Sequence, residues 1–320
     1  MLTKEAHRLN AVPTNKDPIP LQISRQQKAY LYAGCAVLLW STVATAFKLS
    51  LAHMSPLQLL LWADIASILC LGGILAATGR FRLFRGYTAG DLAGAAALGI
   101  LNPFLYYVVL FFAYDLLPAQ EAQPLNYTWA ITLTILSIPL LGHKVSGREL
   151  AGILVSYFGV VIISTHGRPF SLEFSNLGGV ALALGSTVIW ALYWIYNTRS
   201  KIDPVCALFL NFAAALPFIY FACMIFSDIR PPSVPGLAGA VYVGFFEMGI
   251  AFVLWLQALR HTRSAAKISS LIFFSPFLSL VFIHHIAKEP ILASTVAGLV
   301  FIVAGNALQK TGRKAASDSC

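Results

Sequence analysis

Long apolar runs constrain this chain more than any other feature of its sequence. A run of about 20 apolar residues is the length that an α-helix needs to cross the hydrocarbon core of a bilayer. Only helices and closed barrels satisfy their backbone polar groups there, and barrel strands are shorter and alternate between apolar and polar residues. The sequence therefore predicts an all-α integral membrane protein with ten transmembrane helices, at residues 29–50, 56–78, 90–114, 119–141, 148–165, 177–197, 204–227, 236–258, 265–286 and 291–309.

The composition agrees with lipid as the solvent for much of the surface. Apolar residues make up 58% of the chain and charged residues 11%, whereas soluble domains average about 45–50% and about 25%. The net charge of +9 would suggest nucleic-acid binding in a soluble protein, but no polar segment carries a basic stripe with interleaved aromatic residues. We therefore expect the lipid bilayer and no nucleic acid as a partner, and a monomer or weak oligomer.

The distribution of Lys and Arg predicts the orientation. With the N-terminus in the cytoplasm, the outer segments hold only four of the 22 basic residues, namely Lys48, Arg168, Arg230 and Lys288. Cytoplasmic loops of membrane proteins are enriched in Lys and Arg. The prediction is that both termini are cytoplasmic, with tails at residues 1–27 and 311–320.

The chain repeats itself at an interval close to 145 residues. An odd number of spans in each half makes the second half enter the membrane from the opposite side, which is the inverted repeat of many secondary transporters. We therefore predict two five-helix repeats, at residues 28–166 and 177–310; chance recurrence of small-residue motifs is the alternative. The matching motifs are Ser41-Thr42-Val43 with Ser186-Thr187-Val188, Ala151-Gly152 and Gly159 with Ala297-Gly298 and Gly305, and Ser55-Pro56 with Asp203-Pro204.

Two groups of these motif residues predict local structure. Ser55 and Asp203 each place a capping side chain before a proline at the first position of a helix. The paired glycines of spans 5 and 10 lie on one helix face, where small residues let membrane helices approach closely. Spans 5 and 10 carry few polar residues, so we expect them to support the bundle rather than to line a pathway.

Ionisable residues inside the apolar runs are candidates for function, because a charge at membrane depth is costly unless it is paired or hydrated. Glu247 lies at the middle of span 8, where binding of a substrate or proton and a structural hydrogen bond are both open. Asp64 of span 2 is expected to bond to a neighbouring helix. Lys48, near the outer end of span 1, is expected to reach the membrane interface.

Aromatic and polar side chains also gather on helix faces. Trp190, Tyr193, Trp194 and Asn197 share one face of span 6, and Asn126, Trp129 and Thr132 follow at steps of three in span 4. Asn102 and Tyr106 of span 3, and Trp255 and Gln257 of span 8, add to the set. An aromatic belt with interhelical hydrogen bonds would explain some of them. A ligand cavity, which needs an apolar wall with a few polar anchors, explains those deep inside their spans.

Three short motifs carry a resemblance to a known family. Leu38-Leu39-Trp40-Ser41-Thr42, Asn126-Tyr127-Thr128-Trp129 and Ile189-Trp190-Ala191-Leu192-Tyr193, with Glu121 as an acidic position, resemble the drug/metabolite transporter superfamily of the EamA type. Within it, the chain is most similar to the YddG-like aromatic amino-acid exporters. Ala130 departs from the pattern, because that family often has a proline directly after the span-4 tryptophan.

The resemblance implies ten helices in two inverted bundles, a central cavity between spans 1–4 and 6–9, and export of amino acids or related metabolites across the cell inner (plasma) membrane. The expected protein is thus a secondary transporter that works by alternating access, with no cofactor. The expected substrate-binding residues are Trp40, Tyr106, Glu121, Asn126, Tyr127, Trp129, Trp190, Tyr193, Asn197, Glu247 and Gln257.

Other functions fit parts of the sequence. A multidrug or lipophilic-cation efflux pump would have the same aromatic walls. A channel is disfavoured because no glycine-rich filter loop is visible. An intramembrane enzyme is disfavoured because the chain has no HExxH, GxSxG or P-loop motif, and His284-His285 with Glu289 is a weak metal signal, so no metal is expected.

Overall fold

The structure is a computed structural model that describes residues 24–142, 146–170, 174–197, 199–262, 268 and 270–317. These residues form helices and short turns, without a strand among them. The principal elements are α1 (Arg25–Leu51), α2 (Pro56–Ala77), η1 (Arg80–Gly86), α3 (Ala89–Gly99), η2 (Ile100–Leu105), α4 (Tyr106–Leu116), α5 (Ala119–Asn126), α6 (Trp129–Leu141), α7 (Gly147–Ser164), α8 (Leu177–Asn197), α9 (Pro204–Phe226), α10 (Val234–Tyr242), η3 (Val243–Ile250), α11 (Ala251–His261), η4 (Ser270–Phe274), α13 (Ser275–His285) and α14 (Ala293–Ser317).

Seven helical stretches of the described chain are long and apolar enough to cross a membrane, so the prediction of a multi-pass membrane protein is confirmed. They correspond to seven of the ten predicted spans, with α3–η2–α4 and α10–η3–α11 each forming one continuous stretch. Two more predicted spans coincide with shorter apolar helices, Leu271–His285 and Ala293–Gln309. The start of the ninth predicted span and part of the predicted tails lie outside the described residues.

The remaining predicted span, residues 119–141, is divided into α5 and α6. Tyr127 and Thr128 have ψ angles of -5° and -1°, and the amide of Thr128 bonds to the carbonyl of Leu125 at 3.1 Å, which tightens the turn. Pro124 lies inside α5 and supplies no backbone N–H. The break precedes Trp129, so the absence of a proline at Ala130 does not keep this span continuous.

The predicted caps are present. The Ser55 side chain accepts a hydrogen bond from the amide of Gln58, and Asp203 accepts from the amides of Val205 and Cys206. Each is followed by a proline at the first helical position, which loses no intrahelical hydrogen bond there. Both helix starts were predicted correctly from the sequence.

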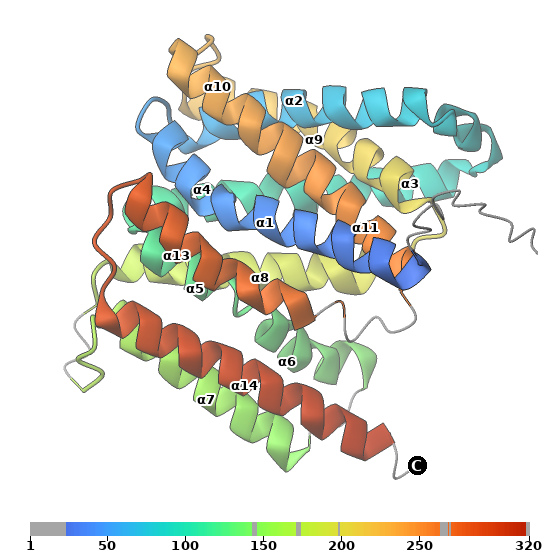
Figure 1. The fold of residues 1–320 in the computed structure, drawn as a ribbon. Coiled ribbons are helices and arrows are strands. Elements are labelled where there is room, and N and C mark those ends of the chain that lie inside the picture. Colours follow the sequence, from blue (N-terminus) through green and yellow to red (C-terminus); the bar gives the residue numbers. More distant parts are fainter. Residues whose placement is uncertain are drawn as a thin grey trace, which may run out of the picture.

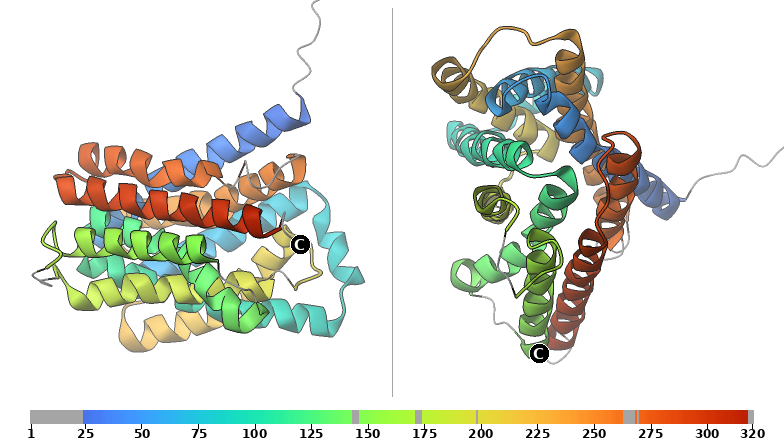
Figure 2. Two further views of the ribbon diagram at one scale, coloured as in Figure 1. Left: turned by 90° about the horizontal axis from the view of Figure 1, so that it is seen from below. Right: turned by 90° about the vertical axis from the view of Figure 1, so that its left-hand side faces the viewer.

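Successive long stretches, with α3–η2–α4, α5–α6 and α10–η3–α11 each counted as one, alternate in direction, so the loops between them gather at two ends of the bundle (Figure 1). α1 begins and α14 ends at the same end, which we call the terminal end. The opposite end, which we call the far end, holds the loops before α2, α5, α8 and α14. The two views in Figure 2 show the helices lying roughly parallel to one another, with α7 and α14 side by side along one edge.

Helix packing joins the two halves of the chain throughout. α1 packs against α11 and α13 of the second half, and α8 packs against α4 and α6 of the first half. Similarly, α2 packs against α9 and η3, while α9 packs against α3 and η2. The core of the bundle is therefore formed by contacts between helices of the first half and helices of the second half of the chain.

The closest helix pair is α7 with α14. Gly152 lies against the backbone of Gly305, and Gly159 lies against the backbone of Gly298, so a Cβ at any of the four would overlap the opposite chain. The Ser156 hydroxyl donates to the carbonyl of Ile302 at 3.2 Å across the same contact. The predicted close approach of the helices carrying these glycines is observed.

Candidate functional site

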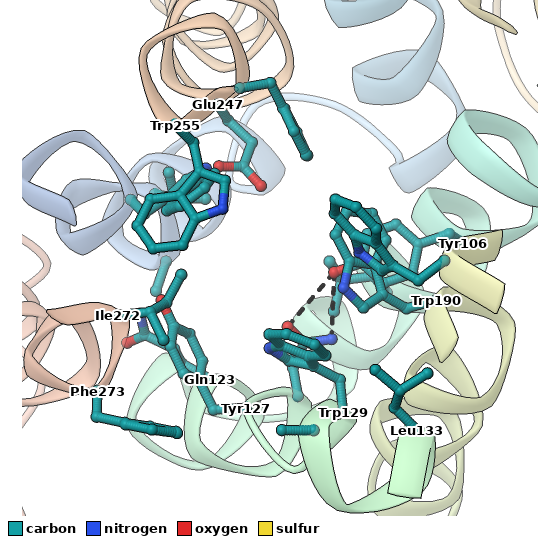
Figure 3. A pocket seen from close by; sticks show the side chains of 18 of the residues that line it. Tyr106, Gln123, Tyr127, Trp129, Leu133, Trp190, Glu247, Trp255, Ile272 and Phe273 are labelled. Atoms are coloured by element: carbon teal, nitrogen blue, oxygen red, sulfur yellow. Dashed lines mark hydrogen bonds between the residues drawn. The ribbon is translucent and has the colours of Figure 1, made fainter. Parts of the chain in front are cut away.

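A cavity of about 470 Å³ lies in the middle of the bundle, between α1, α4, the α5–α6 break, α8, η3, α11 and η4 (Figure 3). Its volume is in the range of small-molecule sites, which are about 300–1,000 Å³. None of the described wall residues belongs to α7 or α14. The cavity thus has the size for one small ligand, and both halves of the chain build it.

Nearly half of the residues in the wall are aromatic. The Tyr106 and Trp190 rings lie 4.6 Å apart between centroids, and Trp190 also contacts Phe252 at 5.9 Å. Trp40 packs against Trp255 with centroids 5.4 Å apart. Large rings supported by one another keep the space open and offer flat apolar faces. The aromatic lining residues are Trp40, Phe47, Tyr106, Tyr114, Tyr127, Trp129, Trp190, Trp194, Phe252, Trp255 and Phe273.

Glu247 lines the cavity from η3, a π-helical segment. Gly244 and Gly249 of η3 lie directly against α2, at Ala63 and Cys70, so η3 approaches α2 closely. Figure 3 shows the Glu247 carboxylate directed toward the open space. One of its oxygens accepts a hydrogen bond from the Tyr107 hydroxyl at 3.3 Å, and the other has no hydrogen-bond partner among the described residues.

The uncharged polar groups of the wall lie around the α5–α6 break. The Asn126 amide donates to Ser186 at 3.0 Å and to the Tyr106 hydroxyl at 3.3 Å. Tyr127 donates to the hydroxyl of Ser275 at 2.8 Å. The side-chain oxygen of Gln123, one turn before Asn126, is buried without a partner among the described residues.

Polar contacts fasten the far end of the bundle around α5. The Glu289 carboxylate accepts hydrogen bonds from the Ala119 and Gln120 amides at 3.0 and 3.2 Å. The Gln120 side chain donates to the carbonyl of Pro290 at 2.6 Å. Lys48, predicted to reach the membrane interface, instead donates to the carbonyls of Tyr114 and Leu117 at 2.8 and 3.0 Å. These bonds join α1, the α4–α5 turn and the α13–α14 connection at the far end.

From the far end, the cavity wall extends along the bundle toward the terminal end. Leu133 and Ser137 line it from the half of α6 nearer the terminal end, and Leu259 and Ile272 line it from the ends of α11 and η4 that lie there. The cavity thus runs from the polar contacts of the far end toward the terminal end.

At the terminal end, Asp203 joins three segments. Arg260 of α11 contacts its carboxylate at 2.8 Å, and Arg80 of η1 contacts it at 3.4 Å. Burial raises the pKa of this carboxyl, but the hydrogen bonds from Arg260 and the Val205 amide and the charge of Arg80 outweigh burial and lower the pKa below its ordinary value. Asp203 is therefore a structural ion pair at neutral pH.

The structure brings seven of the eleven predicted site residues to the cavity wall, and their assignment as substrate ligands stays a prediction. They are Trp40, Tyr106, Asn126, Tyr127, Trp129, Trp190 and Glu247.

The other four lie elsewhere. Glu121 is buried at the far end, where it bonds to His166 at 2.6 Å and to Ser175 at 2.5 Å. The Tyr193 ring supports Trp190 from behind, and its hydroxyl is bonded to Asn211 at 3.1 Å. Asn197 ends α8 and Gln257 lies on α11, neither of them in the wall. Periodicity assigned Tyr193 and Asn197 to the cavity, and the family resemblance assigned Glu121. Gln257 was included as a polar residue of its span, and none of the four is in the wall.

Several wall residues were not predicted. Gln123 stands three residues before Asn126 on the same helix face, so its spacing could have identified it. Phe252 follows a π-helical segment, where the ordinary helical period fails. Ile272 and Phe273 come from an irregular segment without a periodic signal. Asp64, expected to bond to a neighbouring helix, is fully buried with neither carboxylate oxygen bonded among the described residues.

The sequence matches the family model of the EamA-like transporter family twice, at residues 27–165 and 177–309. The chain belongs to the EamA-like transporter family. The predicted family is thereby confirmed, and transport of small molecules is the activity class of an EamA-like transporter.

Similar proteins agree with this family. The chain is 28% identical over 302 residues to an uncharacterized transporter, YvbV, of Bacillus subtilis (strain 168), covering 92% of this chain and 95% of that protein. It is 27% identical over 245 residues to the aromatic amino acid exporter YddG of Ancylobacter novellus, covering 72% of this chain and 79% of that protein. A solved crystal structure with 23% identity superimposes with a TM-score of 0.63 over 89% of this chain and 98% of that chain, which shows a shared fold.

The EamA-like chain shows no metal-binding constellation within its described residues, where no group of three or more His, Cys, Asp or Glu side chains converges. Of the weak histidine signal, His284 bonds to the carbonyl of Glu289 at 3.2 Å, and Glu289 itself caps α5. These residues have structural partners.

Proposed function

We propose that this EamA-like protein is a ten-span secondary transporter that exports amino acids, aromatic and apolar ones included, by alternating access through the central cavity. The observation that carries the proposal is the central cavity, rich in aromatic side chains and with one carboxylate among its described wall residues, built jointly by both halves of the chain. The proposed location is the cell inner membrane, with the terminal end in the cytoplasm.

Packing between the halves supports an inverted repeat. Gly152 and Gly298 occupy equivalent positions, 146 residues apart, and so do Gly159 and Gly305. The contacts are reciprocal, because Gly152 lies against Gly305 and Gly159 lies against Gly298. Reciprocal contacts of this kind arise when two equivalent units are related by a two-fold axis. The two separate family matches agree with this arrangement.

The π-helical segments give a second, independent support. η2 begins at residue 100 and η3 at residue 243, in equivalent spans. Gly99 lies against the backbone of Asn211 in α9, and Gly244, 145 residues later, lies against the backbone of Ala63 in α2. Two similar halves that meet in this way can rock against each other and expose one site to either side in turn.

The chemistry of the wall suits an aromatic amino acid. A substrate ring stacked on Trp40, Trp129 or Trp190 gains about 0.5–1.5 kcal/mol beyond its burial, and an ammonium group over a ring face gains about 0.5–2 kcal/mol. Glu247 offers a partner for the ammonium, and the amide of Gln123 is a polar group near the other side. Stacking tolerates varied side chains, so a broad substrate range is expected.

A lipophilic-cation efflux pump is the second candidate. Glu247 is the only formally charged side chain among the described residues that line the cavity, so the wall holds no cation for a substrate carboxylate. That observation favours cations without a carboxyl group.

Competition in proteoliposomes separates the two functions. The purified protein is reconstituted, radiolabelled phenylalanine is trapped inside, and its exchange is measured against external amino acids and against tetraphenylphosphonium. Saturable phenylalanine exchange that other aromatic amino acids inhibit supports the proposal. Competition by tetraphenylphosphonium with no exchange of any amino acid replaces it with the efflux pump.

The orientation has its own test. Phe170 of the α7–α8 loop is 96% exposed, and Arg82 lies in η1 at the terminal end. A cysteine at position 170 should react with an impermeant maleimide applied to intact cells, and one at position 82 should react only after lysis. The reverse pattern contradicts the proposed orientation.

A further inference from the structure

Resting on the proposed transport through this cavity, we propose that the site recognises the ammonium group of its substrate in preference to the carboxylate, and that each bound ammonium displaces a proton from Glu247. The substrate class is therefore aromatic or apolar primary amines, with amino acids as weaker members. The coupling is an exchange of one organic cation for one proton.

The charge content of the wall carries the first part. Of the described lining residues, only Glu247 is formally charged, and the remaining polar groups are amides, hydroxyls and indole N–H groups, all of them neutral. The nearest basic side chain on α1, Lys48, is held by two carbonyls at the far end. A carboxylate moved from water into such a cavity loses hydration without gaining a counter-charge, which is costly. An ammonium meets Glu247 and the faces of the aromatic rings, both of which attract a cation.

The bonding of Glu247 carries the second part. Tyr107 donates to one of its oxygens, while the other oxygen is buried with no protein partner within the described chain, and the side chain as a whole lines the cavity. Tyr107 itself is fully buried between Tyr106 and Phe111, so the hydrogen bond holds the carboxyl in place. The unpartnered oxygen is the position that either a proton or an ammonium can occupy.

None of the other titratable groups described near this site combines a place in the cavity wall with a carboxyl group that can hold either a proton or an ammonium. η3 packs against α1, α2, α10 and α11, and Tyr107 belongs to α4. On these elements and at the α5–α6 break, the titratable side chains are Arg25, Lys28, Tyr30, Tyr32, Cys35 and Lys48 of α1, Asp64 and Cys70 of α2, Tyr242 of α10, Arg260 and His261 of α11, Tyr106, Tyr107, Tyr114 and Asp115 of α4, and Tyr127. Asp64 is the other buried carboxyl, but it is not part of the cavity wall.

The exchange step balances in charge and atoms. The neutral carboxylic acid of Glu247 and an incoming alkylammonium ion form a carboxylate–ammonium pair, and the carboxyl O–H bond breaks to release one proton to water in the cavity. On the other side of the membrane a proton from water re-forms the O–H bond as the ammonium leaves. No ionised carboxylate is then left without a counter-charge at membrane depth, where it would be costly.

Tryptophan fluorescence offers a direct measurement of binding. Five of the six tryptophans, Trp40, Trp129, Trp190, Trp194 and Trp255, line the cavity. The purified protein in detergent is titrated with four ligands of one phenyl scaffold: phenethylamine, phenylalanine, 3-phenylpropionate and neutral 2-phenylethanol. We expect phenethylamine to bind at least about tenfold more tightly than 3-phenylpropionate, with phenylalanine between them.

Two variants test whether Glu247 is the group that prefers the ammonium and releases the proton. Glu247→Gln should bind 2-phenylethanol as the unmodified protein does, which reports an intact cavity, while the preference for phenethylamine falls to within about twofold. In weakly buffered solution the unmodified protein should release close to one proton per phenethylamine bound. Glu247→Gln should release none, and Asp64→Asn, which alters the buried carboxyl outside the wall, should still release one.

Each opposite result overturns the inference. Equal binding of phenethylamine and 3-phenylpropionate to the unmodified protein excludes recognition of the ammonium without use of any variant. Loss of proton release in Asp64→Asn, or its persistence in Glu247→Gln, excludes Glu247 as the exchanging group. The proposed export fails separately: reconstituted protein that moves no amine or amino acid, yet shows this order of binding, refutes transport and leaves the charge recognition standing.

Discussion

The α7–α14 pair and the cavity bundle use opposite extremes of side-chain size. In the pair, four glycines bring two helices into backbone contact. In the bundle, eleven aromatic side chains line a cavity of about 470 Å³ in the middle of the helices. Helices in contact through glycines leave no space between them for a ligand. Large aromatic rings that pack against each other hold their helices apart and leave a cavity in the middle.

The comparison teaches how one small membrane protein separates stability from function. Helices in lipid associate through close packing and hydrogen bonds rather than through burial from water. The α7–α14 contact supplies such packing away from the cavity, because no wall residue in the described part of the chain comes from α7 or α14. Changes in the pair should therefore alter folding, and changes in the wall should alter ligand recognition.

The largest effect is expected from Gly159→Leu. A side chain here overlaps the backbone of Gly298 and the side chains of Phe301 and Ile302, which only a separation of α7 from α14 relieves. We expect little monodisperse protein in size-exclusion chromatography and a melting temperature lower by at least about 10 °C, since about 1 kcal/mol shifts domains of this size by roughly 2–4 °C. Gly73→Leu, whose Cβ position has open space around it, is the control. Equal losses in both variants would contradict a special role for the pair.

A substitution in the cavity wall should weaken ligand binding rather than lower the stability of the fold. Trp190→Leu removes a ring that Tyr106 and Phe252 contact, and we expect phenylalanine to bind about tenfold more weakly, equivalent to about 1.4 kcal/mol. Trp62→Leu is the matched control, because Trp62 is the tryptophan outside the wall. Fluorescence titration with phenylalanine measures both. If only Trp62→Leu weakened the binding of phenylalanine, the ligand would not bind in this cavity and the prediction would be wrong.

The far-end contact between the two regions predicts a smaller, local effect. Glu289→Gln removes the negative charge that accepts the Ala119 and Gln120 amides at the start of α5, a contact worth about 0.3–2 kcal/mol. Hydrogen exchange at those amides should become about two- to thirtyfold faster, since about 1.4 kcal/mol corresponds to about tenfold. Glu149→Gln in α7 is the control, since glutamine also serves in a capping box. Unchanged exchange in Glu289→Gln would mean that the carboxylate does not fasten α5.

The smallest effect concerns pH. The pKa of Asp203 is lowered in the folded protein, so its ion pairs stabilise the bundle above the ordinary carboxyl pKa of about 3.9 and the stabilisation is lost as pH falls below that value. Asp203→Asn keeps the helix cap but should cost about 0.5–1.5 kcal/mol at pH 7 and less near pH 3, where protonation of the carboxyl begins to remove the charge. Thermal melts at the two pH values test this. A cost that is the same at both would assign it to capping and not to charge.

Much of this arrangement could be predicted from the sequence because it rests on local periodicity. The seven-residue spacing of Gly152 and Gly159 marks one helix face, and the length of the apolar runs locates most helices. The depth of Glu247 in its span identified the charged residue among the described residues of the wall. These features depend only on the order of residues along a helix.

The rest depends on contacts that sequence spacing does not encode. The pairing of Glu289 with α5 joins residues about 170 positions apart, and the π-helical segments shift the faces that follow them, which concealed Phe252. Glu121 looked like a cavity residue by resemblance, yet its contacts with His166 and Ser175 form at the far end. Long-range contacts of this kind become visible only once the helices are placed together.

The central claim is that substrate passes through the aromatic cavity, and filling the cavity tests it most directly. Ala130 lines the wall next to Trp129, so Ala130→Trp places an indole in the space. Ala151→Trp adds the same group to an exposed position on α7. In proteoliposomes matched for protein content, we predict that Ala130→Trp loses at least about 90% of phenylalanine exchange while Ala151→Trp retains most of it. Exchange by a folded Ala130→Trp variant at the rate of the unmodified protein would contradict the account.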